Sequence, residues 1–144
     1  MDSQGIVFTY GYQVGEEMTL IFLLLIGLFI KHFIIDFPLQ KPYHYLNKGT
    51  YLHAGGIEHA ILHTLGTFIV LMVIFPWDIY SHIAAVILAI IDGLIHYHID
   101  WVKTKLNTKF NLTPDNPQFW TLLGFDQLLH ALTYILLIFM IVAV

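Results

Sequence analysis

Long apolar runs separated by short polar segments dominate this chain. Four runs approach or exceed the roughly 20 helical residues that cross the hydrocarbon layer of a membrane. They lie near Met18–Phe37, Gly56–Phe75, Ile79–Val102 and Phe119–Ala143. All 5 prolines fall between these runs, where a missing N–H and a fixed φ do least damage to a helix. The pattern predicts an all-α fold, an integral membrane four-helix bundle.

The polar segments divide the chain into a tail and a membrane domain. Residues 1–17 precede the first apolar run and are predicted to form an extracytoplasmic tail, while residues 18–144 form the four-helix transmembrane domain. The long polar connection KTKLNTKFNLTPDNPQ, residues 103–118, separates the third and fourth runs. Phe75–Tyr80 is predicted to be a tight turn whose aromatic side chains lie at the membrane interface.

Composition agrees with a membrane location. The chain is 58% hydrophobic and 11% charged, with a mean hydropathy of +0.73, whereas soluble domains are about 45–50% apolar. It has no cysteine, so disulfides and thiolate ligands are excluded. Six lysines and no arginine leave too little clustered positive charge for nucleic acid. The partner that composition indicates is the lipid bilayer.

The lysines predict how the bundle is oriented. Lys31 lies within the first span, and the others lie in two loops: Lys41, Lys48, Lys103, Lys105 and Lys109. Because cytoplasmic loops are enriched in positive charge, both lysine-bearing loops should be cytoplasmic. The sequence therefore predicts a multi-pass protein of the cell (inner) membrane with both termini extracytoplasmic.

Every predicted span carries two ionisable residues four positions apart. Such residues lie about 40° apart around a helix and about 6 Å apart along it, so each pair shares a stripe. All four pairs map to the cytoplasmic half, although neighbouring helices run in opposite directions. Because ionisable residues are costly inside a membrane, their coincidence indicates function. The residues are His32, Asp36, His59, His63, His96, Asp100, Asp126 and His130.

This combination of imidazole and carboxylate groups predicts a metal site with these eight residues as its ligands. Helical bundles place such ligands on facing helices, and zinc is the expected ion, with manganese and iron as further candidates. Asp92, Lys103 and Asp126 are candidate catalytic residues. Asp92 lies deeper on the third stripe, where it would hold a second ion or orient a histidine. Lys103 would steady an anionic headgroup or set topology.

The remaining histidines are predicted to stand apart from this site. His44, His53 and His82 are assigned to loops or the membrane interface, without a chemical role. His98 follows His96 by two positions, about 200° around the helix, so it should lie off the stripe.

Four short motifs together resemble a known family. They are HFIIDFPLQK (residues 32–41), HAILH (59–63), HYHIDWVK (96–103) and DQLLH (126–130). In order and spacing they are similar to uncharacterised bacterial and bacteriophage membrane proteins catalogued as domain of unknown function 3307. The resemblance covers the chain after about residue 18 and adds Gln40 and Gln127 to the implicated residues. It implies no activity. The plan is more distantly similar to predicted membrane-bound metal-dependent hydrolases, an analogy of architecture only.

The sequence is compatible with four kinds of function. The leading interpretation is a metal-dependent hydrolase that acts on a lipid or membrane-associated substrate near the cytoplasmic leaflet. A proton- or ion-conducting or transport protein would use the same residues as a relay, and would favour an oligomer. The third is a di-iron membrane oxidase, and the fourth is a non-enzymatic phage or bacterial membrane factor.

Overall fold

The computed structural model describes residues 3–74 and 79–142, and these ranges contain helices and no strand. The elements are α1 (Ser3–Asp36), α2 (Pro42–Tyr45), α3 (Ala54–Ile74), α4 (Ile79–Lys109) and α5 (Pro117–Val142). All except the short α2 are long and apolar enough to cross a membrane. The predicted all-α fold with four membrane-length helices is confirmed.

Two helices extend beyond their predicted apolar runs. α1 already begins at Ser3, although its membrane-length apolar part starts at Val14. α4 continues to Lys109 because the sequence after Val102 contains no glycine or proline before Pro114. The predicted turn at Phe75–Tyr80 lies partly outside the described residues, since residues 75–78 are not among them.

A Schellman motif ends α4 within the polar connection. The Leu112 N–H donates to the Asn107 carbonyl at 2.9 Å, and the Asn111 N–H donates to the Thr108 carbonyl at 3.3 Å. Asn111 has a φ of 51°, a left-handed conformation that asparagine tolerates better than most residues. The first half of this connection is therefore helical, and residues 110–116 form the loop to α5.

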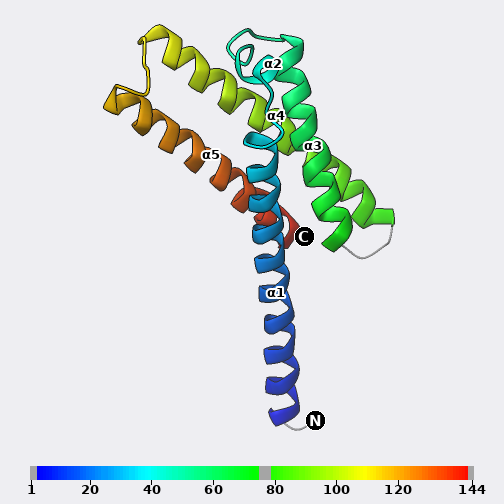
Figure 1. Cartoon of the computed structure of the whole chain (residues 1–144). Coiled ribbons are helices and arrows are strands. Elements are labelled where there is room, and N and C mark those ends of the chain that lie inside the picture. Colours follow the sequence, from blue (N-terminus) through cyan, green and yellow to red (C-terminus); the bar gives the residue numbers. More distant parts are fainter. Residues whose placement is uncertain (1–2, 75–78, 143–144) are drawn as a thin grey trace.

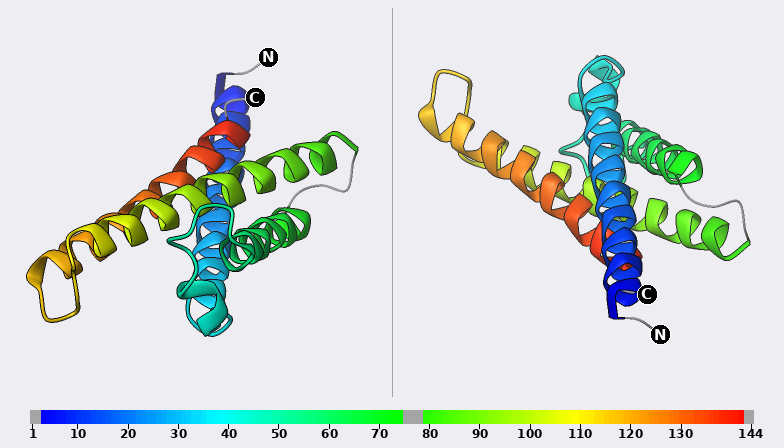
Figure 2. Two further views of the ribbon diagram at one scale, coloured as in Figure 1. Left: turned by 90° about the horizontal axis from the view of Figure 1, so that it is seen from above. Right: turned by 90° about the horizontal axis from the view of Figure 1, so that it is seen from below.

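The four long helices form a ring in which each contacts two others. α3 packs against α1 and α4, and α5 packs against α4 and α1. The helices are splayed: α4 and α5 run side by side away from α1, and α1 extends beyond the other helices (Figures 1 and 2). The loops on either side of α2 and the α4–α5 loop lie toward the top of Figure 1. The N-terminal end of α1 lies at the opposite end.

Apolar and polar side chains occupy different levels inside this ring. Away from the lysine-bearing loops, the core consists of Leu24, Leu28, Leu71, Ala85, Leu88, Tyr134, Leu137 and Ile138. Toward the loops the buried side chains are histidine, aspartate and lysine. Many large apolar side chains point outward instead, among them Ile69, Val73 and Phe139. An apolar exterior around a polar interior is the arrangement expected of helices in contact with lipid.

Glycines bring α1 and α4 close to α3. A Cβ atom on Gly27 would lie 2.8 Å from Val70, and one on Gly66 would lie 2.7 Å from both Ile35 and Lys31. A Cβ on Gly93 would collide with the Thr64 hydroxyl. Small residues at such contacts let membrane helices approach closely. The Gly66 and Gly93 contacts hold α1 and α4 against α3 at the level of the polar cluster, and the Gly27 contact lies among the apolar core residues.

Candidate metal centre

The structure brings all eight predicted ligands into one cluster at the centre of the ring. Seven of them are buried, and Asp36, the last residue of α1, is partly buried. Neighbouring members approach within 4.0 Å, from His32 through Asp36 and Asp100 to Asp126. Each pair lies on one stripe of its helix, as the helical period predicts, and the stripes of the four helices face one another.

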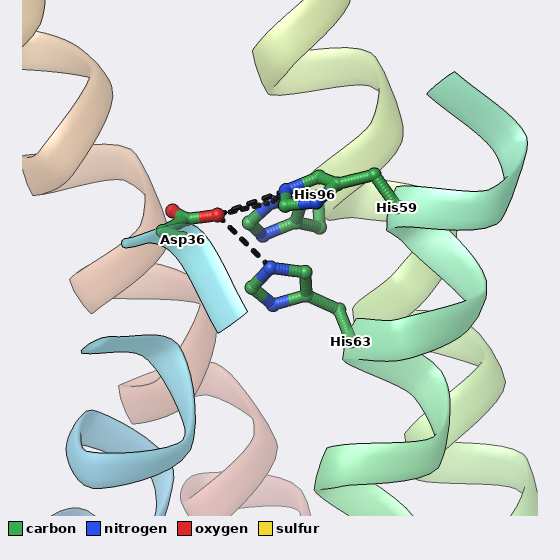
Figure 3. Close-up of side chains that lie close together, drawn as sticks. All are labelled: Asp36, His59, His63 and His96. Atoms are coloured by element: carbon green, nitrogen blue, oxygen red, sulfur yellow. Dashed lines mark hydrogen bonds and ion pairs between the residues drawn. The ribbon is translucent and has the colours of Figure 1, made fainter. Parts of the chain in front are cut away.

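Three histidines point their Nε2 atoms at one carboxylate oxygen (Figure 3). Asp36 Oδ1 lies 2.8 Å from His59, 3.1 Å from His63 and 3.7 Å from His96, measured to Nε2 in each case. Successive turns of α3 supply His59 and His63, and α4 supplies His96. The Gln40 side-chain amide also donates to Asp36 Oδ1, at 3.4 Å. We call Asp36, His59, His63 and His96 the first centre.

Several separations within the first centre match those expected of ligands on one metal ion. Zinc takes imidazole nitrogens and carboxylate oxygens at about 2.0–2.2 Å, so neighbouring ligand atoms around a tetrahedral ion lie about 3.3 Å apart. The Nε2 atoms of His59 and His96 are 3.3 Å apart, and the three distances to Asp36 bracket that value. These buried groups could hold a metal ion in this position.

Lysines face the other two aspartates of the cluster and also Asp92, which lies beside it. Lys31 Nζ lies 2.8 Å from Asp92, and Lys48 Nζ lies 2.6 Å from Asp100. Lys103 Nζ lies 3.8 Å from Asp126. In the part of the chain that the structure describes, no lysine forms an ion pair with Asp36. Its carboxylate faces imidazole rings instead of an amine.

The sequence alone does not reveal that Lys31 and Lys48 form buried ion pairs with aspartates. The sequence marks Lys31 only as a lysine within a span, and Lys48 only as a determinant of topology. The one available signal is that a lysine inside an apolar span usually pairs with a buried acid. Lys48 gives no such signal, because it lies in a loop and meets Gly56 of α3 and Asp100 of α4 only in the folded chain.

Asp92 lies deeper than the first centre, and Lys31 contacts both Asp92 and His63 of that centre. Its Oδ2 accepts hydrogen bonds from Lys31 Nζ and from the Thr67 hydroxyl, the latter at 2.6 Å. Lys31 Nζ is also 3.2 Å from His63 Nδ1 and 3.2 Å from the Tyr134 hydroxyl. Within the described residues, Asp92 belongs to none of the groups of donors that could share an ion. The catalytic role suggested for it stays a prediction.

His32 lies beside the first centre with both ring nitrogens engaged. Its Nδ1 is 2.8 Å from the Tyr134 hydroxyl, and its Nε2 is 3.2 Å from Gln127 Oε1 and 3.1 Å from Asp36 Oδ2. These contacts suit a histidine that orients Asp36. They also give Gln127 a place at the site. His32, His96 and His130 form a second group of donors within reach of one ion, and Asp100, Asp126 and His130 form a third.

The other histidines differ in their distance from this cluster. His44 is buried in α2, where its Nδ1 accepts the Lys41 N–H at 3.3 Å and its ring lies 5.8 Å from that of His59. Burial lowers the pKa of His44, while the nearby Glu58 carboxylate opposes this effect. His53 Nδ1 accepts the Gly55 N–H at the start of α3. His98 is exposed and its Nδ1 lies 2.7 Å from the Leu94 carbonyl oxygen, off the inward stripe.

A buried histidine–aspartate cluster enclosed by four membrane-length helices defines the class, a multi-pass helical membrane protein that could bind metal. Within that class, the chain belongs to the family described as "Protein of unknown function (DUF3307)", whose model matches residues 24–144. The match begins within α1 and includes every residue of the cluster. No curated protein and no solved structure matches the chain.

Proposed function

We propose that this protein is a membrane-embedded metalloprotein whose first centre holds one divalent ion, zinc in the first instance, and that it hydrolyses a lipid or membrane-associated substrate near the cytoplasmic leaflet. The observation that carries the proposal is the convergence of three Nε2 atoms on Asp36 Oδ1. Three imidazoles and one carboxylate are donors that such an ion takes, and an ion that expands to a fifth position would still accept the water that hydrolysis needs.

The distribution of charge favours an ion at this position. A carboxylate taken out of water is costly unless a cation or hydrogen bonds compensate it. Lysines provide that cation for Asp92, Asp100 and Asp126. A divalent ion would provide it for Asp36. The competing interpretation, a metal-free relay, instead requires a histidine to carry the compensating proton.

The surrounding carboxylates support hydrolysis as the chemistry. A bound divalent ion would acidify water and polarise a carbonyl or phosphoryl group. Asp100 Oδ2 lies 3.2 Å from His96 Nε2 and 3.5 Å from His59 Nε2, so this carboxylate is within reach of an ion or a water molecule at the centre. Lys48 holds the same oxygen at 2.6 Å and keeps the carboxylate oriented toward the histidines.

An apolar groove between α4 and α5 favours a lipid as substrate. It has a volume of about 240 Å³, and Lys103 and Asp126 belong to its lining. The rest of the lining is mostly apolar: Ile99, Val102, Leu106, Leu122, Phe125 and Leu129, with His98. A second groove of about 360 Å³ shares Leu106, Leu122 and Phe125 with it. An acyl chain would fit these surfaces, and Lys103 would face an anionic headgroup.

The metal content of the full chain tests the proposal. Protein purified in lipid nanodiscs should contain zinc, and chelation should abolish hydrolysis of phospholipid or other ester-bearing lipids. Adding zinc back should restore it. As a control, His53→Ala should keep the metal content, because His53 lies outside the cluster and its Nδ1 contacts the start of α3.

Different results of the same measurements would favour the competing functions. An iron-dependent optical spectrum would favour the di-iron oxidase, and protein that never retains metal would favour the relay or the non-enzymatic factor. Activity unchanged by chelation would contradict a metal-dependent hydrolase.

The proposed location near the cytoplasmic leaflet depends on orientation. The two lysine-bearing loops lie toward the same end of the structure in Figure 1, and the polar cluster occupies the half of the ring nearest them. By the positive-inside rule, alkaline phosphatase fused after Val144 should be active and a green fluorescent protein fused there should be dark. Fusions after Asp115 should show the reverse pattern. A fluorescent C-terminal fusion would place the centre near the other leaflet.

A further inference from the structure

A second group of metal-binding atoms lies directly beside the first centre. His130 Nε2 is 3.9 Å from Asp100 Oδ1 and 3.6 Å from Asp126 Oδ1. These separations exceed the usual length of a hydrogen bond, and two ligands of one ion lie about 3–4 Å apart. All three side chains are buried. Asp126 and His130 come from successive turns of α5, and Asp100 comes from α4.

Two atoms of this group are buried without a hydrogen-bond partner. Within the described residues, Asp126 Oδ1 and His130 Nε2 both lack a hydrogen-bond partner, and their residues are only 3% and 2% exposed. The other oxygen of Asp126 is engaged, since Oδ2 accepts from the Gln127 amide at 3.1 Å and faces Lys103. Buried polar atoms in native proteins are normally satisfied, so an unpaired carboxylate oxygen facing an unpaired imidazole nitrogen calls for a ligand.

Asp100 connects this group to the first centre. Its Oδ1 faces His130, while its Oδ2 lies 3.2 Å from His96 Nε2 and 3.5 Å from His59 Nε2. Carboxylates in paired-metal sites bridge two ions in this way, with one oxygen toward each. We infer that a second divalent cation binds between Asp100, Asp126 and His130, and that the Asp100 carboxylate bridges it to the ion of the proposed first centre. The inference rests on the proposed function.

A nearby lysine makes the two positions unequal. The second ion would bind next to Asp126, which Lys103 already faces, whereas no lysine pairs with Asp36 in the described structure. Like charges at this distance repel, so the second ion should bind more weakly than the first. Lys103 Nζ lies 3.8 Å from Asp126 Oδ2, and its side chain is 24% exposed. Removing its charge should strengthen binding at the second position.

Titration of metal-free protein in nanodiscs with Zn²⁺ or Mn²⁺ tests this inference. The wild-type chain should take up two equivalents in two steps. Asp126→Asn and His130→Gln should each keep the tighter equivalent and lose the weaker one. Lys103→Met should tighten the weaker step by roughly tenfold, because one like charge at this distance is removed. Lys105→Met is the matched control, since Lys105 is an exposed lysine of the same helix, and it should change neither step.

Electron paramagnetic resonance of the Mn²⁺-loaded protein reports the bridge directly. The wild-type chain should give the signal of an exchange-coupled pair, and Asp126→Asn should give that of an isolated ion. The second site would be overturned if the wild-type chain bound a single equivalent that Asp126→Asn and His130→Gln left unchanged. If Asp36→Asn removed that equivalent, the first centre would still be supported. Wild-type protein that binds no metal would overturn both. Lys103→Met keeps every proposed ligand, so it remains informative if a ligand variant does not fold.

Discussion

Replacing Asp36 with asparagine should empty the first centre while the chain remains folded. Asparagine keeps the shape of the side chain but removes the negative oxygen at which His59, His63 and His96 point. Losing even an outer partner of a metal ligand costs roughly 10–100-fold in affinity, so loss of the carboxylate itself should cost more than about a hundredfold. Metal content after gel filtration and direct titration would measure this change.

An aspartate outside the helices supplies the matched control. Asp115 is exposed in the α4–α5 loop, so Asp115→Asn should keep the full metal content. Unchanged affinity in Asp36→Asn would contradict the first centre. If the wild-type chain binds no metal and Asp36→Asn abolishes proton flux in liposomes, the cluster is a relay.

Replacing Lys31 with methionine should produce a large loss of stability. The Lys31–Asp92 pair is almost completely buried, with 4% and 1% of the two side chains exposed and 2.8 Å between the charged atoms. Removing one partner of such a pair leaves an uncompensated buried charge and typically costs about 3–5 kcal/mol. Unfolding in detergent, followed by circular dichroism against increasing denaturant, would measure the change in free energy of unfolding.

The double variant separates the ion pair from packing. Lys31→Met combined with Asp92→Leu removes both charges, so it should recover most of the stability lost in Lys31→Met alone. Exposed Lys109→Met should have little effect and controls for the loss of a lysine. Equal destabilisation in the single and double variants would show that the pair itself contributes little.

Asp92→Asn addresses the catalytic role that the sequence suggests for this residue. If Asp92 acts through Lys31 and His63, the variant should keep its metal equivalents and bind the first one more weakly. Loss of a whole equivalent would instead place an ion on Asp92 itself.

The ligand pairs could be predicted from sequence because the period of the helix determines which residues share a face. His59 and His63 project from one stripe whatever the neighbouring helices do, and the alternating direction of the spans gave their relative depth. The approximate spans could be predicted from hydropathy. The end of α4 could not, because this helix continues through a polar segment that a hydrophobicity criterion excludes.

The partners of these residues could not be predicted, because they depend on how helices pack. Lys31 and Asp92 are 61 positions apart, and nothing local links them before α1 and α4 meet. Lys48 illustrates a second reason, since loop lysines are ordinarily attributed to membrane topology. Thr67 and Tyr134 carry no charge at neutral pH, so a search for ionisable residues passes over two hydroxyl groups that hold Asp92, Lys31 and His32 in place.

The close glycine contacts have a consequence for the order in which the protein is assembled. They join α1, α3 and α4, the helices that supply Asp36, His59, His63 and His96, whereas a Cβ on Gly124 of α5 would meet nothing within 4 Å. Membrane helices are inserted first and associate afterwards, and a chain is made from its N-terminus. The three helices that complete the first centre therefore leave the ribosome ahead of α5. A newly made chain can gather these four donors while its last helix is still on the ribosome.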